Sequence, residues 1–407
     1  MIQRVSTYNL FRSGEQNIVA RQREVLATQQ QLASGKRING PADDPLGAAD
    51  GISIRSNIAQ LGQFKRNQDH ARNMLNLGES ALTGVTGGVQ DVLDKLVAAG
   101  NGAYSDSDRR TIAGELEGVL ARIVGLANAS DGAGGYLFAG SREKAAPFAQ
   151  SGNSVSFSGD EILQRLEVAQ DRYAQIKFSG DALFNKTRAG NGSFTVAAAA
   201  GNAGAASADA GSVIDPAALT GRPYTVSFAV SGGVTTYSIT RSEASGPPTT
   251  VASGTYGTPA TLQFDGIKLG FIGSPADGDS FSVAPAGYQS VFDTLAQAIE
   301  ALKQPVAGNP AAAAQQRTAL GAAQAAMNGA LDHMLLKRAE MGAALAELDA
   351  YAGLNDDRRL QSQTQLAGIE DLDYASATTE LSRRQLSYQA ALQSYSMVSK
   401  LSLFNYL

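Results

Sequence analysis

The 407-residue sequence contains no cysteine, no tryptophan and only two histidines, His70 and His333. Without cysteine the chain has no disulfide, no thiol nucleophile, and no cysteine ligands for zinc or an iron–sulfur cluster. Two histidines far apart in the sequence are poor material for a two-histidine metal site or a histidine-dependent catalytic triad. Both lie in helical regions, where we expect a surface or packed histidine rather than a ligand.

Charge and apolar runs exclude two further classes of protein. A formal net charge of −5, from 33 basic and 38 acidic residues, predicts no general attraction to nucleic acid. The long uncharged stretches, 189–208 and 244–264, are rich in Ala, Gly, Ser and Thr, which gain too little on leaving water to span a membrane. Residues 1–11 lack the apolar run of a secretory leader. We expect a soluble chain of two or three domains at ~150 residues each.

Apolar residues recur every seven positions from Ile54 to Ala99. Two such rows, three residues apart, predict a long helix in coiled-coil-like contact. Glycines within the rows destabilise a helix by up to ~1 kcal/mol each relative to alanine, so we allow a break near Gly87. The first row is Ile54, Leu61, Gln68, Leu75, Leu82, Val89 and Leu96, and the second is Phe64, Ala71, Gly78, Val85, Val92 and Ala99.

Two more helices are indicated inside the chain. Side chains in 105–108 are suited to capping a helix that continues through 112–126. A row in steps of seven then runs through Leu320, Met327, Met334, Met341 and Leu348. Methionine can supply an adaptable partner-binding face, but the spacing favours the core of a helix bundle.

Both ends of the chain carry heptads, and such ends most simply pair with each other. The C-terminal heptad row contains three tyrosines, Tyr374, Tyr388 and Tyr395. Such large amphipathic rings are not expected on a frayed tail, and they favour burial at an interface over a purely intramolecular core. The candidate assembly residues are Phe11, Ile18, Val25, Leu32, Tyr374, Leu381, Tyr388, Tyr395, Val398 and Phe404.

The first forty residues are locally basic, with six basic side chains against two acidic ones and a net charge of +4. This composition is also typical of an organellar transit peptide or an interfacial membrane helix. Neither alternative explains the matching heptads at the opposite end, so we favour paired terminal helices.

The middle of the chain has strand texture. Apolar residues alternate over 224–230, a Ser-Gly-Gly turn follows, and 234–240 continues the pattern, which predicts a β-hairpin. Strands are also expected over 264–283, and a smaller strand-rich patch at 155–184. The Ala/Gly/Ser stretch 197–212 is a candidate linker or loop. The predicted fold is α+β: helical ends flank a helical body, which flanks an inserted β-rich domain.

Several segments imitate chemical motifs. The sequence at 34–36 hints at a phosphate loop but lacks the preceding glycine, and the glycine cluster at 132–135 lacks the last glycine of a dinucleotide fingerprint. Asp43-Asp44 and Asp277-Gly278-Asp279 do not follow the calcium-loop spacing. For all four we expect turns or helix caps.

Two longer segments carry a family resemblance. The stretch Gln31–Ala49, read as QLASGKRINGPADDPLGAA, and the following 52–85 closely resemble the N-terminal signature of the bacterial flagellin superfamily. Residues 369–383 with Gln385 resemble the superfamily's C-terminal signature. Three shorter pieces, at 2–8, 135–141 and 401–407, are similar to the branch that forms the hook–filament junction. The similarity covers about 1–185 and 286–407.

This resemblance implies a non-enzymatic structural subunit of the extracellular flagellum at the hook–filament junction, without a cofactor or metal. Implied partners are the first hook-associated junction protein on the hook side, flagellin on the filament side, further copies in a ring, and a type III export chaperone holding the C-terminal helix. The implied domains are 1–40 with 363–407, 41–190 with 286–362, and the inserted 191–285. A flagellin-type filament subunit is the alternative, and an enzyme or membrane-associated coiled coil is a more distant one.

Overall fold

The computed structural model describes residues 7–400, which form two compact units. One unit consists of the chain up to Arg66 together with the chain from Ala350 onward, and the other is Asn67–Asp349. Two long helices, α2 and α5, contribute to both units. The α-helices are α1 Thr7–Ser34, α2 Pro45–Ala99, α3 Asp106–Ala127, α4 Val291–Lys303, α5 Pro310–Glu370 and α6 Tyr374–Lys400.

The strands all fall between α3 and α4. They are β1 Phe148–Ser151, β2 Ser154–Phe157, β3 Arg165–Ala169, β4 Arg172–Gln175, β5 Thr187–Arg188, β6 Phe194–Ala198, β7 Ser207–Ala208, β8 Ser212–Val213, β9 Tyr224–Ser231, β10 Val234–Arg241, β11 Thr249–Thr255, β12 Ala260–Phe264, β13 Ile267–Ile272, β14 Ser280–Pro285 and β15 Tyr288–Gln289. Long helices at both ends and antiparallel sheets in the middle confirm the predicted α+β class.

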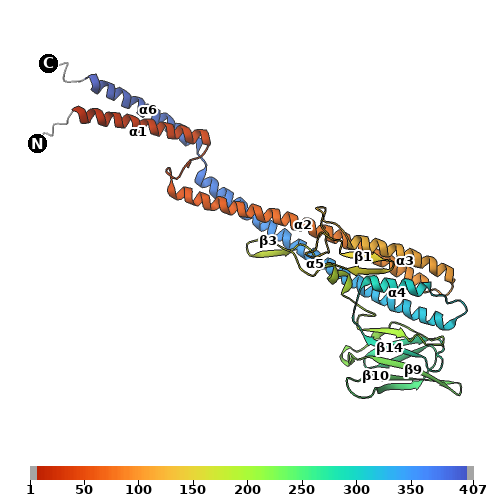
Figure 1. Ribbon diagram of the computed structural model, residues 1–407. Helices are drawn as coiled ribbons and strands as arrows, with labels where there is room; N and C mark the ends of the chain where they lie inside the picture. The colour runs from red at the N-terminus through yellow and green to blue at the C-terminus, as the bar shows by residue number, and fades with distance from the viewer. Residues whose placement is uncertain (1–6, 401–407) are drawn as a thin grey trace, which may run out of the picture. The chain divides into compact units, whose positions relative to one another are not determined.

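In the first unit, α1 and α6 lie side by side and run antiparallel (Figure 1). Contacts between Phe11 and Tyr395, and between Thr28 and Arg384, fix this direction. The terminal heptads therefore pair with each other, as the sequence pattern predicts.

In the second unit, the heptad rows of α2 form a buried seam. From Gln68 to Ala99 the members of both rows are buried, most of them completely. The expected break near Gly87 was wrong, because α2 continues without interruption to Ala99. Packing of Val85, Val89 and Val92, each fully buried, outweighs the cost of the glycines. Gly88 also lets α3 approach closely, since a Cβ there would lie 2.8 Å from Ile123 Cγ1.

The other predicted helices pack onto this seam. Ser105 caps α3 in a reciprocal capping box with Asp108, which confirms the capping signal. The methionines of α5, Met327, Met334 and Met341, are buried, which confirms the core interpretation. Five phenylalanine rings, two of them from the hairpin β1–β2, pack with centroids 5.1 to 5.8 Å apart; they are Phe138, Phe148, Phe157, Phe184 and Phe292.

The inserted β-rich part contains two antiparallel sheets around one core. Five strands follow the order β11-β10-β9-β14-β6, and a second sheet follows β12-β13-β7, with β8 also pairing with β13. The predicted hairpin is confirmed as β9–β10, whose turn residues Gly232 and Gly233 have φ of +60° and +79°. Such angles favour glycine and match the twist of a two-residue hairpin. Phe228, Phe271 and Phe281 meet edge-on in the core between the sheets.

The stretch 197–212 is not a linker, contrary to the sequence-based expectation. Its first two residues end β6, Ser207–Ala208 form β7 against β13, and Ala206 and Ala208 are buried in the core. Small side chains pack here because the partner strand carries the large ones, Phe271 among them. Composition alone does not reveal a partner strand.

The inserted part is entered and left through one pair of short strands. β5 pairs with β15, the Ala189 N–H donates to the Gly287 carbonyl at 3.0 Å, and the Arg188 guanidinium lies 4.8 Å from the centre of the Tyr288 ring. Among the helices described within 7–400, none has both the length and the apolar character needed to cross a membrane.

Candidate assembly interface

The terminal helices meet through a mixed apolar and polar seam. The Phe11 and Tyr395 rings are edge-to-face with centroids 6.2 Å apart. Gly14 leaves space for this arrangement, since a Cβ there would lie 2.8 Å from Tyr395 Cδ2. The other predicted α1 residues, Ile18, Val25 and Leu32, are half-buried, as are Leu381 and Tyr388 on α6. The pair is therefore only partly covered by its own residues.

A polar contact crosses the middle of the pair. Thr28 is buried, and its hydroxyl accepts from Arg384 Nη1 at 3.0 Å while donating to the Glu24 carbonyl at 2.9 Å. Arg384 also donates to that carbonyl and, through Nε, to Glu380. Hydrogen bonds from Arg383 and Arg384 lower the pKa of Glu380 from its ordinary 4.5 to about 2. Sequence analysis missed this contact because heptad spacing records only apolar residues.

Two predicted residues are exposed, and one lies outside the described chain. Tyr374 is 56% exposed, with its hydroxyl close to Gly35, where the chain turns with φ of +68°. Val398 is also exposed. Phe404 lies beyond residue 400, outside the described residues.

An apolar stripe runs along the outer side of α1. Its residues, Tyr8, Val19 and Leu26, are spaced eleven and seven positions apart, and both spacings are close to whole turns of a helix. All three are exposed, Leu26 to 55%. On α6, Leu386 (68% exposed) and Met397 are likewise eleven positions apart. Apolar side chains aligned on one face indicate a surface that a partner covers.

At the other end of the pair, the turns around Gly35 and Asp371 are bound together. The Arg37 N–H donates to the Glu370 carbonyl at 2.6 Å, and the Leu372 N–H to the Gly35 carbonyl at 3.0 Å. The Glu370 carboxylate, 7% exposed, accepts from Lys36 Nζ at 3.0 Å and from Arg55 Nη2 at 2.5 Å. Burial opposes its ionisation, but these two hydrogen bonds outweigh that effect and lower the pKa of Glu370.

The segments that imitate chemical motifs are turns and caps, as expected. Asp43 accepts from the Asn39 and Gly40 N–H groups, and Asp44 from the Gly47 N–H at the start of α2. Asp279 is buried and accepts from the backbone of 203, 204 and 276. In 132–135, Asp131 holds the turn by accepting from the Ala133 and Gly135 N–H groups.

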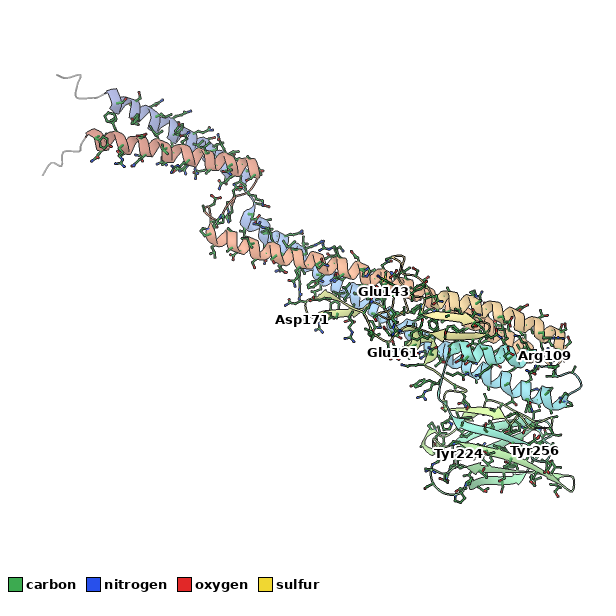
Figure 2. The ribbon with its side chains drawn as sticks, in the orientation of Figure 1. Arg109, Glu143, Glu161, Asp171, Tyr224 and Tyr256 are labelled. Atoms are coloured by element: carbon green, nitrogen blue, oxygen red, sulfur yellow. The ribbon has the colours of Figure 1, made fainter. Side chains whose placement is uncertain are left out.

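One buried cation lies beside that turn. Lys177, whose side chain is 4% exposed, donates to Glu143 at 2.6 Å and to Asp131 at 3.5 Å (Glu143 is labelled in Figure 2). The pKa of Glu143 is lowered mainly by its hydrogen bonds from Lys177 and Gln164. Lys177, two residues after β4, is thus joined to Asp131 and Glu143 in the segment that follows α3. This segment contains residues 135–141, one of the pieces that carry the family resemblance.

Comparison with known proteins identifies the family. Residues 5–143 match the bacterial flagellin N-terminal helical region, and residues 196–285 match the D2-like domain of flagellar hook-associated protein 1. The chain is 25% identical to flagellar hook-associated protein 3 of Salmonella typhimurium, over 98% of each chain. Among solved structures, FlgL from Xanthomonas campestris is 30% identical with a TM-score of 0.69, covering 76% of this chain and 98% of that one. The chain belongs to the FlgL family.

A second FlgL-type structure agrees with this assignment. Flagellar hook-associated protein 3 from Legionella pneumophila is 27% identical with a TM-score of 0.73, covering 78% of this chain and 98% of that one. Membership of the FlgL family makes the chain a structural protein of the bacterial flagellum at the hook–filament junction. The flagellin-like match ends at residue 143, whereas the similarity to hook-associated protein 3 spans nearly the whole chain, which favours the junction branch over a filament subunit.

Proposed function

We propose that the paired helices α1 and α6 are the surface through which this FlgL-family chain joins neighbouring flagellar subunits. The observation that carries the proposal is the apolar stripe of Tyr8, Val19 and Leu26, whose side chains remain exposed in the described chain, Leu26 to 55%. Burying one leucine side chain contributes about 1.5 to 3 kcal/mol, so even a short stripe can hold a subunit contact.

The predicted residues divide into two roles within this proposal. Phe11, Ile18, Val25, Leu32, Leu381, Tyr388 and Tyr395 set the geometry of the pair. Tyr374 and Val398, both exposed, face the neighbouring subunits, and Phe404, outside the described residues, belongs to the same proposed surface. In the assembled junction, 1–40 with 363–407 form the inner layer, 41–190 with 286–362 the next layer, and 191–285 the outer surface.

The partners follow from the position of the family at the junction. One side of a ring of these chains contacts the first hook-associated junction protein, and the other side seats flagellin. Before assembly, the chain leaves the cell through the flagellar type III apparatus with a chaperone on the C-terminal helix, and it works outside the cell. Helix faces carry out this role without catalysis, which is consistent with carboxylates engaged in turns, caps and ion pairs.

The proposal is tested by assembly on isolated hooks that carry the hook-side junction protein. The full chain is added, then flagellin, and filaments are counted by negative-stain electron microscopy. Leu26→Asp places a charge on the stripe and should lower the affinity of attachment at least about tenfold, because the lost burial and the cost of desolvating the carboxylate together exceed about 1.4 kcal/mol. The matched control is Gln16→Asp, the same charge at an exposed polar position of α1.

Retained attachment by Leu26→Asp, with unchanged helicity by circular dichroism, would contradict the proposed surface. A second outcome concerns the alternative function. Long filaments formed by this chain alone would support a flagellin-type subunit, whereas a short layer that needs hooks and then nucleates flagellin supports the junction role.

A further inference from the structure

A cavity of about 290 Å³ lies between the end of α2, the first turns of α3 and the beginning of α5. Its walls include Leu96, Gly100 and Gly102 from the α2–α3 region and Leu320 from α5. Its volume is close to the lower limit for sites that enclose small ligands. None of the paired terminal helices contributes to it.

Arg109 lines this cavity, and its buried charge is only weakly paired. The residue is 9% exposed, and its Nε is buried with no hydrogen-bond partner in the described chain. Its contact with Asp106 is long, with 3.5 Å between Nη1 and Oδ1. That carboxylate is already engaged, because it accepts from the Val306 and Ala307 N–H groups at 3.1 to 3.2 Å. Asp106 therefore balances the Arg109 charge only in part, which leaves this wall of the cavity positive and favourable for an anion.

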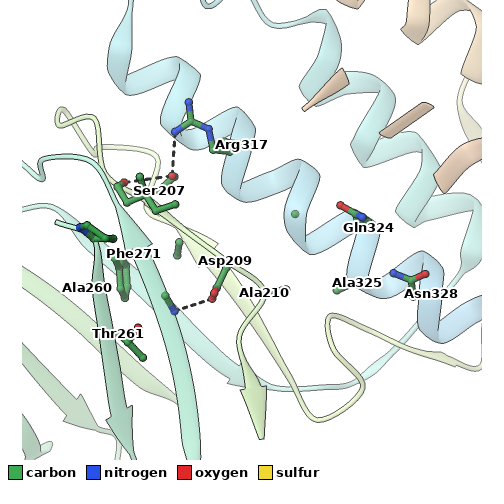
Figure 3. A pocket seen from close by; sticks show the side chains of 15 residues that line it. Ser207, Asp209, Ala210, Ala260, Thr261, Phe271, Arg317, Gln324, Ala325 and Asn328 are labelled. Carbon is green, nitrogen blue, oxygen red and sulfur yellow. Dashed lines mark hydrogen bonds between the residues drawn. The ribbon is translucent and has the colours of Figure 1, made fainter. Parts of the chain in front are cut away.

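The rest of the lining has the charge of an anion site. Arg317 of α5 is the second cation, and Gln316 and Gln324 contribute side-chain amides. No acidic residue is among the described residues that line the cavity. Arg317 makes one weak hydrogen bond within the described part of the chain, from Nη1 to Ser207 Oγ at 3.4 Å (Figure 3). Arg317 and Gln324 also line a neighbouring cavity of about 580 Å³ against β7 and β13, so a ligand has a path of approach.

We propose that this cavity binds a small oxyanion, with Arg109 as its main ligand and Arg317 closing the site. The guanidinium fork matches the paired oxygens of a phosphate or carboxylate group, and charge-assisted hydrogen bonds of this kind are about twice as strong as neutral ones. An oxyanion held between the two arginines would offset their positive charges. The site is separate from the proposed assembly surface and does not depend on the proposed function.

The test is calorimetric titration of the full chain with inorganic phosphate at constant ionic strength. We expect saturable binding of one phosphate per chain, which Arg109→Gln weakens by about 10- to 100-fold, the usual effect of losing a hydrogen bond to a charged group. The matched control is Arg110→Gln, because Arg110 is the next residue of α3, is exposed and donates to the Asp106 carbonyl instead. The phosphate affinity of the Arg110→Gln chain should be unchanged. Tighter binding of citrate by the same residues would also support the proposal.

The absence of saturable binding of both anions would overturn the proposal, as would equal losses in the two variants. If Arg109→Gln lowers helicity, the proposal is tested instead by Arg317→Gln, because Arg317 is exposed and its replacement should not disturb the fold. We expect about a 2- to 5-fold loss of phosphate affinity from it, in line with a partly solvated ion pair. Unchanged affinity in a folded Arg317→Gln chain would overturn the site.

Discussion

Arg55 and Glu370 are 315 positions apart in the sequence, and their side chains meet at 2.5 Å between Nη2 and Oε1. Glu370 ends α5, and Arg55 lies in the first turns of α2. Lys36, two residues after the end of α1, reaches the other oxygen of the same carboxylate. One buried acid therefore fixes three helices at the point where the chain turns toward its paired ends.

Removing this acid should loosen the turns that it holds. In Glu370→Gln the two cations lose their common partner, and we expect hydrogen exchange at the Arg37 and Leu372 amides to accelerate about tenfold or more, equivalent to the ~1.4 kcal/mol or more that a hydrogen bond to a charged group contributes. Exchange is measured by mass spectrometry or NMR. Asp371→Asn, at the exposed neighbouring residue, is the control, and equal acceleration in both variants would contradict the role of Glu370.

The same contact should depend on pH in a defined direction. Because the pKa of Glu370 is lowered in the folded chain, its contribution to stability is present above its ordinary value of 4.5 and is lost as the pH falls through the lower folded value. The protection factors at Arg37 and Leu372 should therefore fall in acid below pH 4.5. In Glu370→Gln that acid-dependent step should be missing from the same measurement.

Replacing either of two adjacent glycines in α2 by alanine should change the stability of the chain in opposite directions. A Cβ at Gly87 meets nothing within 4 Å, so Gly87→Ala should stabilise the chain by about 0.5 to 1 kcal/mol through helix propensity. At Gly88 the added methyl would lie 2.8 Å from Ile123 Cγ1, and overpacking costs about 1 to 3 kcal/mol. Denaturant titrations of both variants measure the difference, and stabilisation by Gly88→Ala would contradict the close approach of α3.

A buried and an exposed lysine should differ in their contribution to stability. Lys177→Met leaves the nearly buried Asp131 carboxylate without its cation, and the half-exposed Glu143 without its hydrogen bond, and should destabilise the chain by about 3 kcal/mol. Lys186→Met removes a half-exposed cation from Glu161 and Asp181 and should cost at most about 1 kcal/mol. Thermal and denaturant unfolding compare the two, and similar losses would contradict the burial argument.

The Glu380 carboxylate should titrate far below an ordinary glutamate. Its pKa of about 2 arises first from Arg383 and then from Arg384. Carbon NMR of the labelled carboxyl should therefore show a midpoint near pH 2, and Arg383→Gln should move the midpoint upward toward 4.5. A midpoint that stays near 2 in this variant would assign the effect to Arg384 alone.

Features with local periodicity could be predicted from the sequence. The rows of α2, the methionine row of α5 and the β9–β10 hairpin follow from spacing and turn residues, because each pattern repeats over neighbouring positions. The pairing of the terminal helices could also be predicted, since Phe11 and Tyr395 both belong to heptads. The low helix propensity of glycine wrongly predicted a break near Gly87, because burial of the surrounding valines outweighs it.

Contacts between single polar residues could not be predicted in this way. Thr28 with Arg384, Glu370 with Arg55, and Lys177 with Asp131 each join positions far apart, and none repeats at a regular spacing. The outer stripe of Tyr8, Val19 and Leu26 was also missed, because it is short and uses a spacing of eleven as well as seven. Ala206 and Ala208 look like linker residues until β13 is placed beside them.

The strand pair β5–β15 makes the inserted part a module whose two ends lie side by side, held by the strand pairing and by the hydrogen bond from the Ala189 N–H to the Gly287 carbonyl. Any segment whose ends can lie that close together could occupy this position without altering the path of the helices on either side. The length and content of the outer part can therefore change between relatives, or be replaced by design with a short turn, while the helical body keeps the same chain path.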